Sequence, residues 1–250
     1  MIITLGLILI AYLVFIEPYL RNKSRKYFFT NYKTDKNARA KMYRQDFVRN
    51  IFIGFLVISL AWITSISPSE LGLRPPSVHQ FLAYPLIGKF ILVAIFCWFI
   101  FYFFFFVTIG VRLHKRFRAY LVNKVRVVAP SAPVTLKDHC WWTANALASA
   151  FEELAYRGFV FFLVFYLWPS ASIWIAGVIA VLLEAVRYAP RFAAMKYVAE
   201  RAAVFTLAFI VFHSLWAAII LHVIYNLRIM AVPFHWVQED EASNKSTSIA

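Results

Sequence analysis

Long apolar runs alternate along the chain with short segments that carry most of its charge. The apolar runs cover residues 1–16, 51–66, 90–111, 140–168, 173–186 and 202–227. A helix that crosses a bilayer needs roughly 20 apolar residues, and fewer where neighbouring helices bury its ends. The pattern therefore predicts an all-α protein, a polytopic transmembrane bundle of about six to eight membrane helices.

The first apolar run is predicted to stay in the mature protein as a transmembrane helix. It has no basic residues before it and no small-residue cleavage site after it, so it does not read as a cleaved signal peptide. Glu17, Pro18 and Arg21 follow the run directly. These polar residues and the proline are expected to end the first helix.

Two later stretches carry signals for where helices begin and end. A helix is expected to start near Thr135 and to run through Glu152 until Pro169 stops it. The last run, 202–227, allows either one long helix or two helices broken at "FHSLW", where Ser214 suits an N-cap. We favour two helices, which makes seven spans and puts the N-terminus outside.

No repeat and no long linker divides the chain. Residues 1–232 are predicted to form a single transmembrane domain with its core motifs in 135–228, and 233–250 a polar C-terminal tail on the inner side.

Composition and charge agree with a membrane protein. The chain is 62% hydrophobic with a mean hydropathy of +0.67, well above the soluble average of about 45–50% apolar residues. The net charge of +14 gathers in segments that follow apolar runs: 21–50 holds ten Lys/Arg against two Asp, and 112–138 holds seven against one. Such segments mark the cytoplasmic side and attract anionic lipid headgroups, so we expect no nucleic-acid partner.

Three charges interrupt the apolar stretch "SAFEELAYRGFVFF": Glu152, Glu153 and Arg157. Each charge at the centre of a membrane helix costs about 2.5–3.5 kcal/mol, so they must face protein or trapped water. Glu153 and Arg157 are four residues apart and can neutralise each other. Glu152 points about 100° away around the helix, which leaves it without a complete local partner and makes it a functional candidate.

A second polar pair lies in "HVIYN", where His222 and Asn226 occupy one face of an apolar helix. By themselves they are typical of interhelical hydrogen bonds that hold a bundle together. Together with buried carboxylates, they supply the acid, base and hydrogen-bond donors that hydrolysis requires.

The string E-E-x-x-x-R, followed downstream by H-x-x-x-N, resembles the CAAX protease and bacteriocin-processing family, also called Abi. The stretches "LGLRPPS" and "SLWAAIILH" are also similar to that family. The resemblance implies an intramembrane endopeptidase in which Glu152 activates a water and Glu153 and Arg157 form its supporting pair. His222 and Asn226 would then stabilise the oxyanion.

The family's second motif, F-x-x-x-H, is altered in this sequence. Alignment on "IWIAGVIAVLLEAVRY" puts Leu183 at the Phe position and Arg187 at the His position. Arginine does not act as a base at neutral pH. A literal match, "FIVFH", ends at His213, which is an alternative candidate for the missing histidine. Glu184 is expected to pair with Arg187.

Three functions stay open. The first is a peptidase of the bacterial inner membrane that cleaves membrane-associated or lipidated peptides or proteins, and the second is an inactive family member that serves as a scaffold or binding protein. The third is a transporter that uses buried carboxylates. No cofactor is certain: Glu152, His213 and His222 could supply three zinc ligands, but no H-E-x-x-H spacing supports this, and Cys97 and Cys140 fit no metal spacing.

Overall fold

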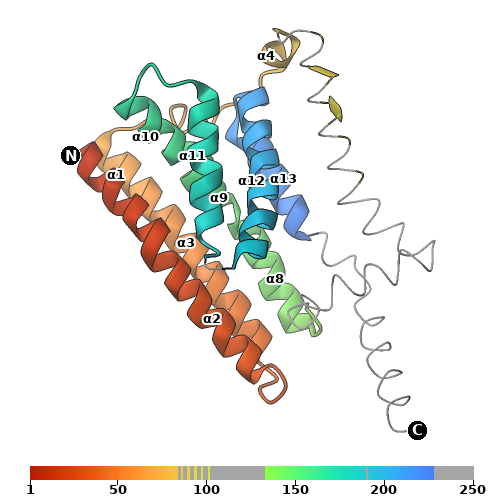
Figure 1. The fold of residues 1–250 in the computed structure, drawn as a ribbon. Helices are drawn as coiled ribbons and strands as arrows, with labels where there is room; N and C mark the ends of the chain where they lie inside the picture. The colour runs from red at the N-terminus through yellow and green to blue at the C-terminus, as the bar shows by residue number, and fades with distance from the viewer. Residues whose placement is uncertain are drawn as a thin grey trace.

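The computed structural model describes residues 1–83, 133–189 and 191–227, with isolated positions between 86 and 101. Within these residues every regular element is a helix and no strand occurs. The helices pack side by side as a bundle (Figure 1), so the predicted all-helical bundle is confirmed. Most of the predicted span at 90–111 and the whole tail at 233–250 lie outside the described residues.

The N-terminal part is a hairpin of two long helical segments (Figure 1). The first segment runs through α1 (Ile2–Ala11), a π-helical turn η1 (Tyr12–Ile16) and α2 (Glu17–Asn31). The second segment is α3 (Ala38–Thr64), which returns alongside α1 and α2. The basic segment 21–50 therefore forms the tip of the hairpin at one end of the bundle.

The expectation that Glu17, Pro18 and Arg21 end the first helix was wrong. The helix continues because Pro18 occupies one of the first positions of α2, where a missing backbone N–H breaks no essential bond. The preceding π-helical turn shifts the backbone bonding pattern by one residue. The polar residues are then carried along the same rod into the interior of the bundle.

The central helix follows the predicted bounds closely. It is composed of α8 (Leu136–Ala148), α9 (Ala150–Glu153), the π-helical turn η4 (Leu154–Phe159) and α10 (Val160–Leu167). It begins with a capping box, in which the Thr135 and Asp138 side chains each bond the other's backbone N–H.

The C-terminal part contains three helices: α11 (Ile173–Val186), α12 (Phe192–Phe212) and α13 (Leu215–Leu227). The break between α12 and α13 confirms the two-helix prediction. It is made by His213 in the left-handed conformation, with φ of 46°. The turn packs on the loop that precedes α4 (Val78–Ala83), since the Leu215 N–H donates to the Gly72 carbonyl.

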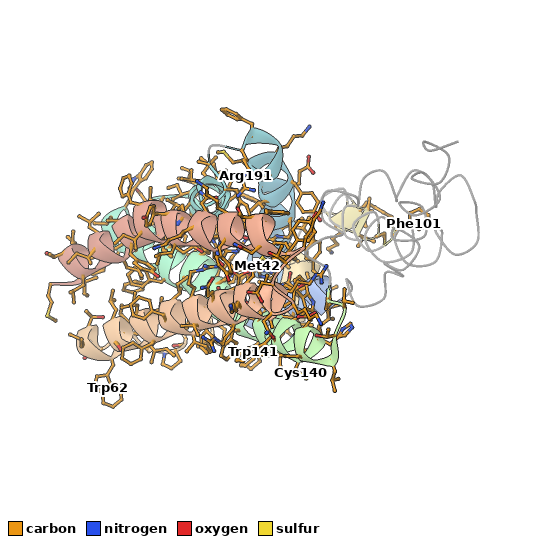
Figure 2. The ribbon with its side chains drawn as sticks, turned by 90° about the horizontal axis from the view of Figure 1, so that it is seen from below. Met42, Trp62, Phe101, Cys140, Trp141 and Arg191 are labelled. Atoms are coloured by element: carbon orange, nitrogen blue, oxygen red, sulfur yellow. The ribbon has the colours of Figure 1, made fainter. Side chains whose placement is uncertain are left out.

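The outer surface of the bundle has the character of a membrane protein. The segment 2–31 and α3 are long and apolar enough to cross a membrane, and α11 and α13 are shorter apolar helices. Tryptophans gather where α3 and α10 end and where α11 and α13 begin, and their exposed fractions are Trp62 86%, Trp168 52%, Trp174 50% and Trp216 48%. Figure 2 shows Trp62 projecting away from the ribbon. Such belts mark the membrane interface, and the number of spans stays a prediction.

The N-terminal hairpin and the central helix approach each other very closely at Gly54. A Cβ atom at this position would lie 2.1 Å from Cδ1 of Phe151. The aromatic ring therefore packs directly on the backbone of α3. This contact sets the distance between α3 and α9, and so places the residues that follow Phe151.

We predict that Gly54→Ala destabilises the protein. Overpacking of this kind costs about 1–3 kcal/mol, which outweighs the gain of about 1 kcal/mol that alanine brings to a helix interior. Ile58→Ala, one turn further along α3 at a 51% exposed side chain, is the matched control and should change stability by about 0.5 kcal/mol or less. Thermal unfolding in detergent measures both variants; a Gly54→Ala protein as stable as the wild type would contradict the close approach.

Candidate functional site

The consecutive residues Glu152 and Glu153 lie at the centre of the bundle, and each enters a different group of buried charges. The first cluster contains Glu17, Arg21, Glu152 and Arg187, and the second cluster contains Glu153, Arg157, Glu184, Arg201 and His222. Because successive residues on a helix point about 100° apart, one short helix can supply a carboxylate to both clusters.

In the first cluster, both oxygens of Glu152 are held by arginine. Arg187 donates from Nη1 to Oε2 at 3.0 Å and from Nη2 to Oε1 at 2.9 Å. Arg21 donates from Nη2 to Oε1 at 3.2 Å. The planar guanidinium of Arg187 thus grips the carboxylate with two parallel bonds, an arrangement that is stronger and more directional than a single contact.

The same two arginines also hold Glu17, which reaches the cluster from the start of α2. Arg187 donates from Nε and Nη2 to the two oxygens of Glu17 at 3.2 and 3.0 Å, and Arg21 donates from Nε at 2.8 Å. Glu17 is 0% exposed and Arg187 is 1% exposed. Buried Arg49 also lies 3.9 Å from Glu17 and pairs with Asp46. Three carboxylates and three guanidiniums therefore balance in charge, which burial in a low-dielectric interior demands.

In the second cluster, Arg157 joins three helices. It donates to Glu153 Oε1 at 3.2 Å and to Glu184 Oε2 at 2.5 Å, and its remaining groups bond the Thr206 hydroxyl and the Ala202 carbonyl. The predicted pair of Glu153 and Arg157 is therefore confirmed.

The expected pair of Glu184 and Arg187 was wrong. Glu184 accepts from Arg157 and, at 3.0 Å, from Arg201. Arg187 follows the end of α11, and its side chain faces the first cluster. Positions three residues apart lie only about 60° apart around a helix, so helix geometry alone would permit this pair. The tertiary partners decide otherwise: Glu184 binds arginines of η4 and α12, and Arg187 binds carboxylates of α2 and α9.

His222 on α13 contacts Glu153, whereas the bonds of Glu152 come from Arg21 and Arg187. Its Nδ1 lies 2.6 Å from Glu153 Oε1, and its ring stacks on Phe205 with centroids 4.7 Å apart. A carboxylate beside Nδ1 selects the tautomer with the proton on that nitrogen. Among the described residues, Oε2 of Glu153 has no hydrogen-bond partner although it is buried.

The other two candidates from the sequence, Asn226 and His213, take part in neither charge cluster through the bonds of the described residues. Asn226 follows one turn after His222 on the same helix, and its backbone carbonyl accepts from Trp142 Nε1 at 3.1 Å. His213 lies in the turn after α12, roughly 16 Å along the helix from Ala202 at 1.5 Å per residue, and its backbone carbonyl accepts from Arg74. The structure thus brings His222 to the glutamates and does not bring His213 to them.

In the part of the chain that the structure describes, no three His, Cys, Asp or Glu side chains are grouped as a metal site requires. The zinc set of Glu152, His213 and His222 is not assembled, because His213 lies at the far end of α12.

Glu17, Arg21 and Arg201 belong to the site and were missed in the sequence. The available signal was the spacing of Glu17 and Arg21, a favourable pair four residues apart directly after an apolar run. Nothing in the sequence indicates that this pair turns inward to meet residues more than 130 positions away.

Comparison with protein families adds to this geometry. Residues 139–228 match the model described as type II CAAX prenyl endopeptidase Rce1-like. This part of the chain is Rce1-like. The match confirms the family resemblance drawn from the two motifs, since the Rce1-like segment contains both of them. The family's members are membrane proteins of CAAX-type protease function, which agrees with the apolar outer surface. Comparison with curated proteins and with solved structures gave no match.

We predict that Glu17 and Arg187 are energetically coupled. Glu17→Gln or Arg187→Gln alone leaves one uncompensated charge in the buried cluster and should cost about 3–5 kcal/mol of stability. The double variant should cost less than the sum of the two, by about 1–3 kcal/mol. Unfolding in detergent of the wild type, both single variants and the double variant measures this coupling.

The exposed ion pair of Lys41 and Asp35, with N···O of 2.9 Å, is the matched control. Its double-variant cycle should give a coupling below about 1 kcal/mol, as expected for a solvated pair. Strict additivity at Glu17 and Arg187 would show that the buried contacts do not stabilise the fold.

Proposed function

We propose that the chain is a membrane-embedded binding protein built on the peptidase fold of its family, which engages membrane-associated or lipidated peptides without hydrolysing them. The observation that carries this proposal is the grip of Arg187 on both oxygens of Glu152. A general base must take a proton from the water that it activates. Here three bonds from arginine to the two oxygens stabilise the ionised carboxylate and oppose its protonation.

The chemistry of Arg187 adds to this support. Resemblance to the family puts a histidine at this position, where it would share the activation of water with Glu152. A guanidinium has five donors and no acceptor, and it does not release a proton at neutral pH. Arg187 therefore replaces a group that accepts protons with one that only donates hydrogen bonds.

We further infer a multi-pass location in a bacterial inner membrane, with the hairpin tip 21–50 on the cytoplasmic side in contact with anionic headgroups. The orientation and the headgroup contact are supported by the charge of this segment, which holds ten Lys/Arg, and by its position at the end of the bundle opposite the tryptophan belt.

Hydrolysis and binding are measured separately to test the proposal. Purified protein in liposomes is expected to bind a fluorescent lipidated peptide and to leave it uncleaved, as followed by mass spectrometry. Arg187→His alone leaves the carboxylates of the first cluster with one guanidinium too few, so the informative variant is the double change Glu17→Gln with Arg187→His, which restores the charge balance.

The double variant should gain cleavage by about 10²-fold, the usual contribution of a general base. Adding Glu152→Ala is the control and should remove the gain. Cleavage by the wild type that Glu152→Ala abolishes would contradict the proposal and establish a Glu152-dependent peptidase. Failure of the wild type to bind any lipidated peptide would remove the binding role.

A second candidate function is hydrolysis that depends on Glu153 in place of Glu152. The observation that favours it is the free Oε2 of Glu153 beside His222. A water on this oxygen would give a proton to the carboxylate, and its hydroxide would add to the peptide carbonyl carbon. The proton would then pass to the leaving amine as the C–N bond breaks. In this case the wild type cleaves, Glu153→Gln abolishes cleavage, and Glu152→Gln does not.

A further inference from the structure

An apolar groove of about 370 Å³ runs between α11 and α12 on the outer side of the bundle. Its floor is made by three buried residues, Gly177, Thr206 and Ile210. Its rim includes Trp174 and Val178, with exposed fractions of 50% and 59%. The groove therefore opens away from the charged interior, toward the medium that surrounds the bundle.

The depth of the groove depends on glycine at position 177. A Cβ atom there would lie 3.1 Å from both Cγ2 of Thr206 and Cδ1 of Ile210, tighter than ordinary van der Waals contact. Thr206 turns this methyl toward the groove while its hydroxyl accepts the bond from Arg157. The only hydroxyl of the floor is thus already used on the opposite side of the helix.

We propose that this groove binds one acyl chain of a membrane phospholipid. A peptide in the groove would bury backbone N–H and C=O groups without partners, at a cost of several kcal/mol that hydrocarbon does not incur. At about 30 Å³ for an atom group the size of water, the volume accommodates roughly twelve carbons of a single chain.

The position of the groove along the bundle matches one leaflet. It starts at Trp174, in the first turn of α11 at the tryptophan end of the bundle, and reaches Leu182. At 1.5 Å per residue this is roughly 12 Å, close to the hydrocarbon depth of one leaflet, about 15 Å. A lipid with its glycerol at the level of Trp174 would lay its chain along the groove.

The test uses the protein in nanodiscs made with a phospholipid that carries a diazirine on one acyl chain. After irradiation, lipid adducts should concentrate on peptides of α11 and α12. Ala203 lies on the exposed rim of the groove, and Ala203→Phe should fill it. The adducts should fall about tenfold, because excluding only two methylenes of the acyl chain from the groove weakens its binding by about that factor. Ile58→Phe on the exposed face of α3 should leave them unchanged.

A photoreactive phenylalanine derivative at Val178 gives a second readout that does not depend on filling the groove. The expected product is protein with the mass of one added phospholipid. Crosslinks to another segment of this chain or to a second copy would overturn the proposal, since they would show a different occupant. Adducts spread evenly over all exposed helices, and unaffected by Ala203→Phe, would also overturn it. The inference is independent of whether the chain hydrolyses peptides.

Discussion

The interaction on which the rest of the structure depends is the contact of one buried guanidinium, Arg187, with two carboxylates. Glu17 comes from the N-terminal helix and Glu152 from the central helix, while Arg187 follows α11. Each of these charges alone would be expensive at membrane depth. Because their costs are offset only when all of them meet, the contact fixes the positions of three helices relative to one another.

The neighbouring residue Glu153 does the same for the other half of the bundle. It binds Arg157 and His222, and Arg157 in turn reaches Glu184 and two groups of α12. Two adjacent glutamates thus anchor two charge clusters that face different sides of one helix. Apolar side chains form both the outer surface and a buried core around the central helix. Within that core the directional polar bonds specify packing that dispersion alone would leave loose.

How much of this could be predicted from the sequence depends on the range of each interaction. The helix start near Thr135, the break within "FHSLW" and the pair of Glu153 and Arg157 are local features, and the sequence predicted all three correctly. The partners of Glu152 and Glu184 are tertiary. Sequence spacing favoured a local partner for Glu184, but the structure gives it arginines 27 and 17 residues away. A charged Glu152 inside an apolar run correctly indicated a buried site. Its partner Arg21 is 131 residues away in the sequence, so no local spacing could identify it.

In the altered second motif, arginine stands at position 187 where the family resemblance puts histidine. This change is tied to the first cluster, because Arg187 pairs there with Glu17 and Glu152. With arginine at position 187, the first cluster and the adjoining pair of Arg49 and Asp46 hold three positive and three negative groups. A neutral histidine there would leave three carboxylates facing two guanidiniums, and the excess negative charge would be buried. The fold therefore accommodates Arg187 because Glu17 is present to balance its charge, and it accommodates Glu17 because Arg187 is present. The position that would favour hydrolysis in a related sequence here serves to hold the N-terminal helix against the Rce1-like segment, and the same bonds that stabilise this packing occupy the oxygens of Glu152.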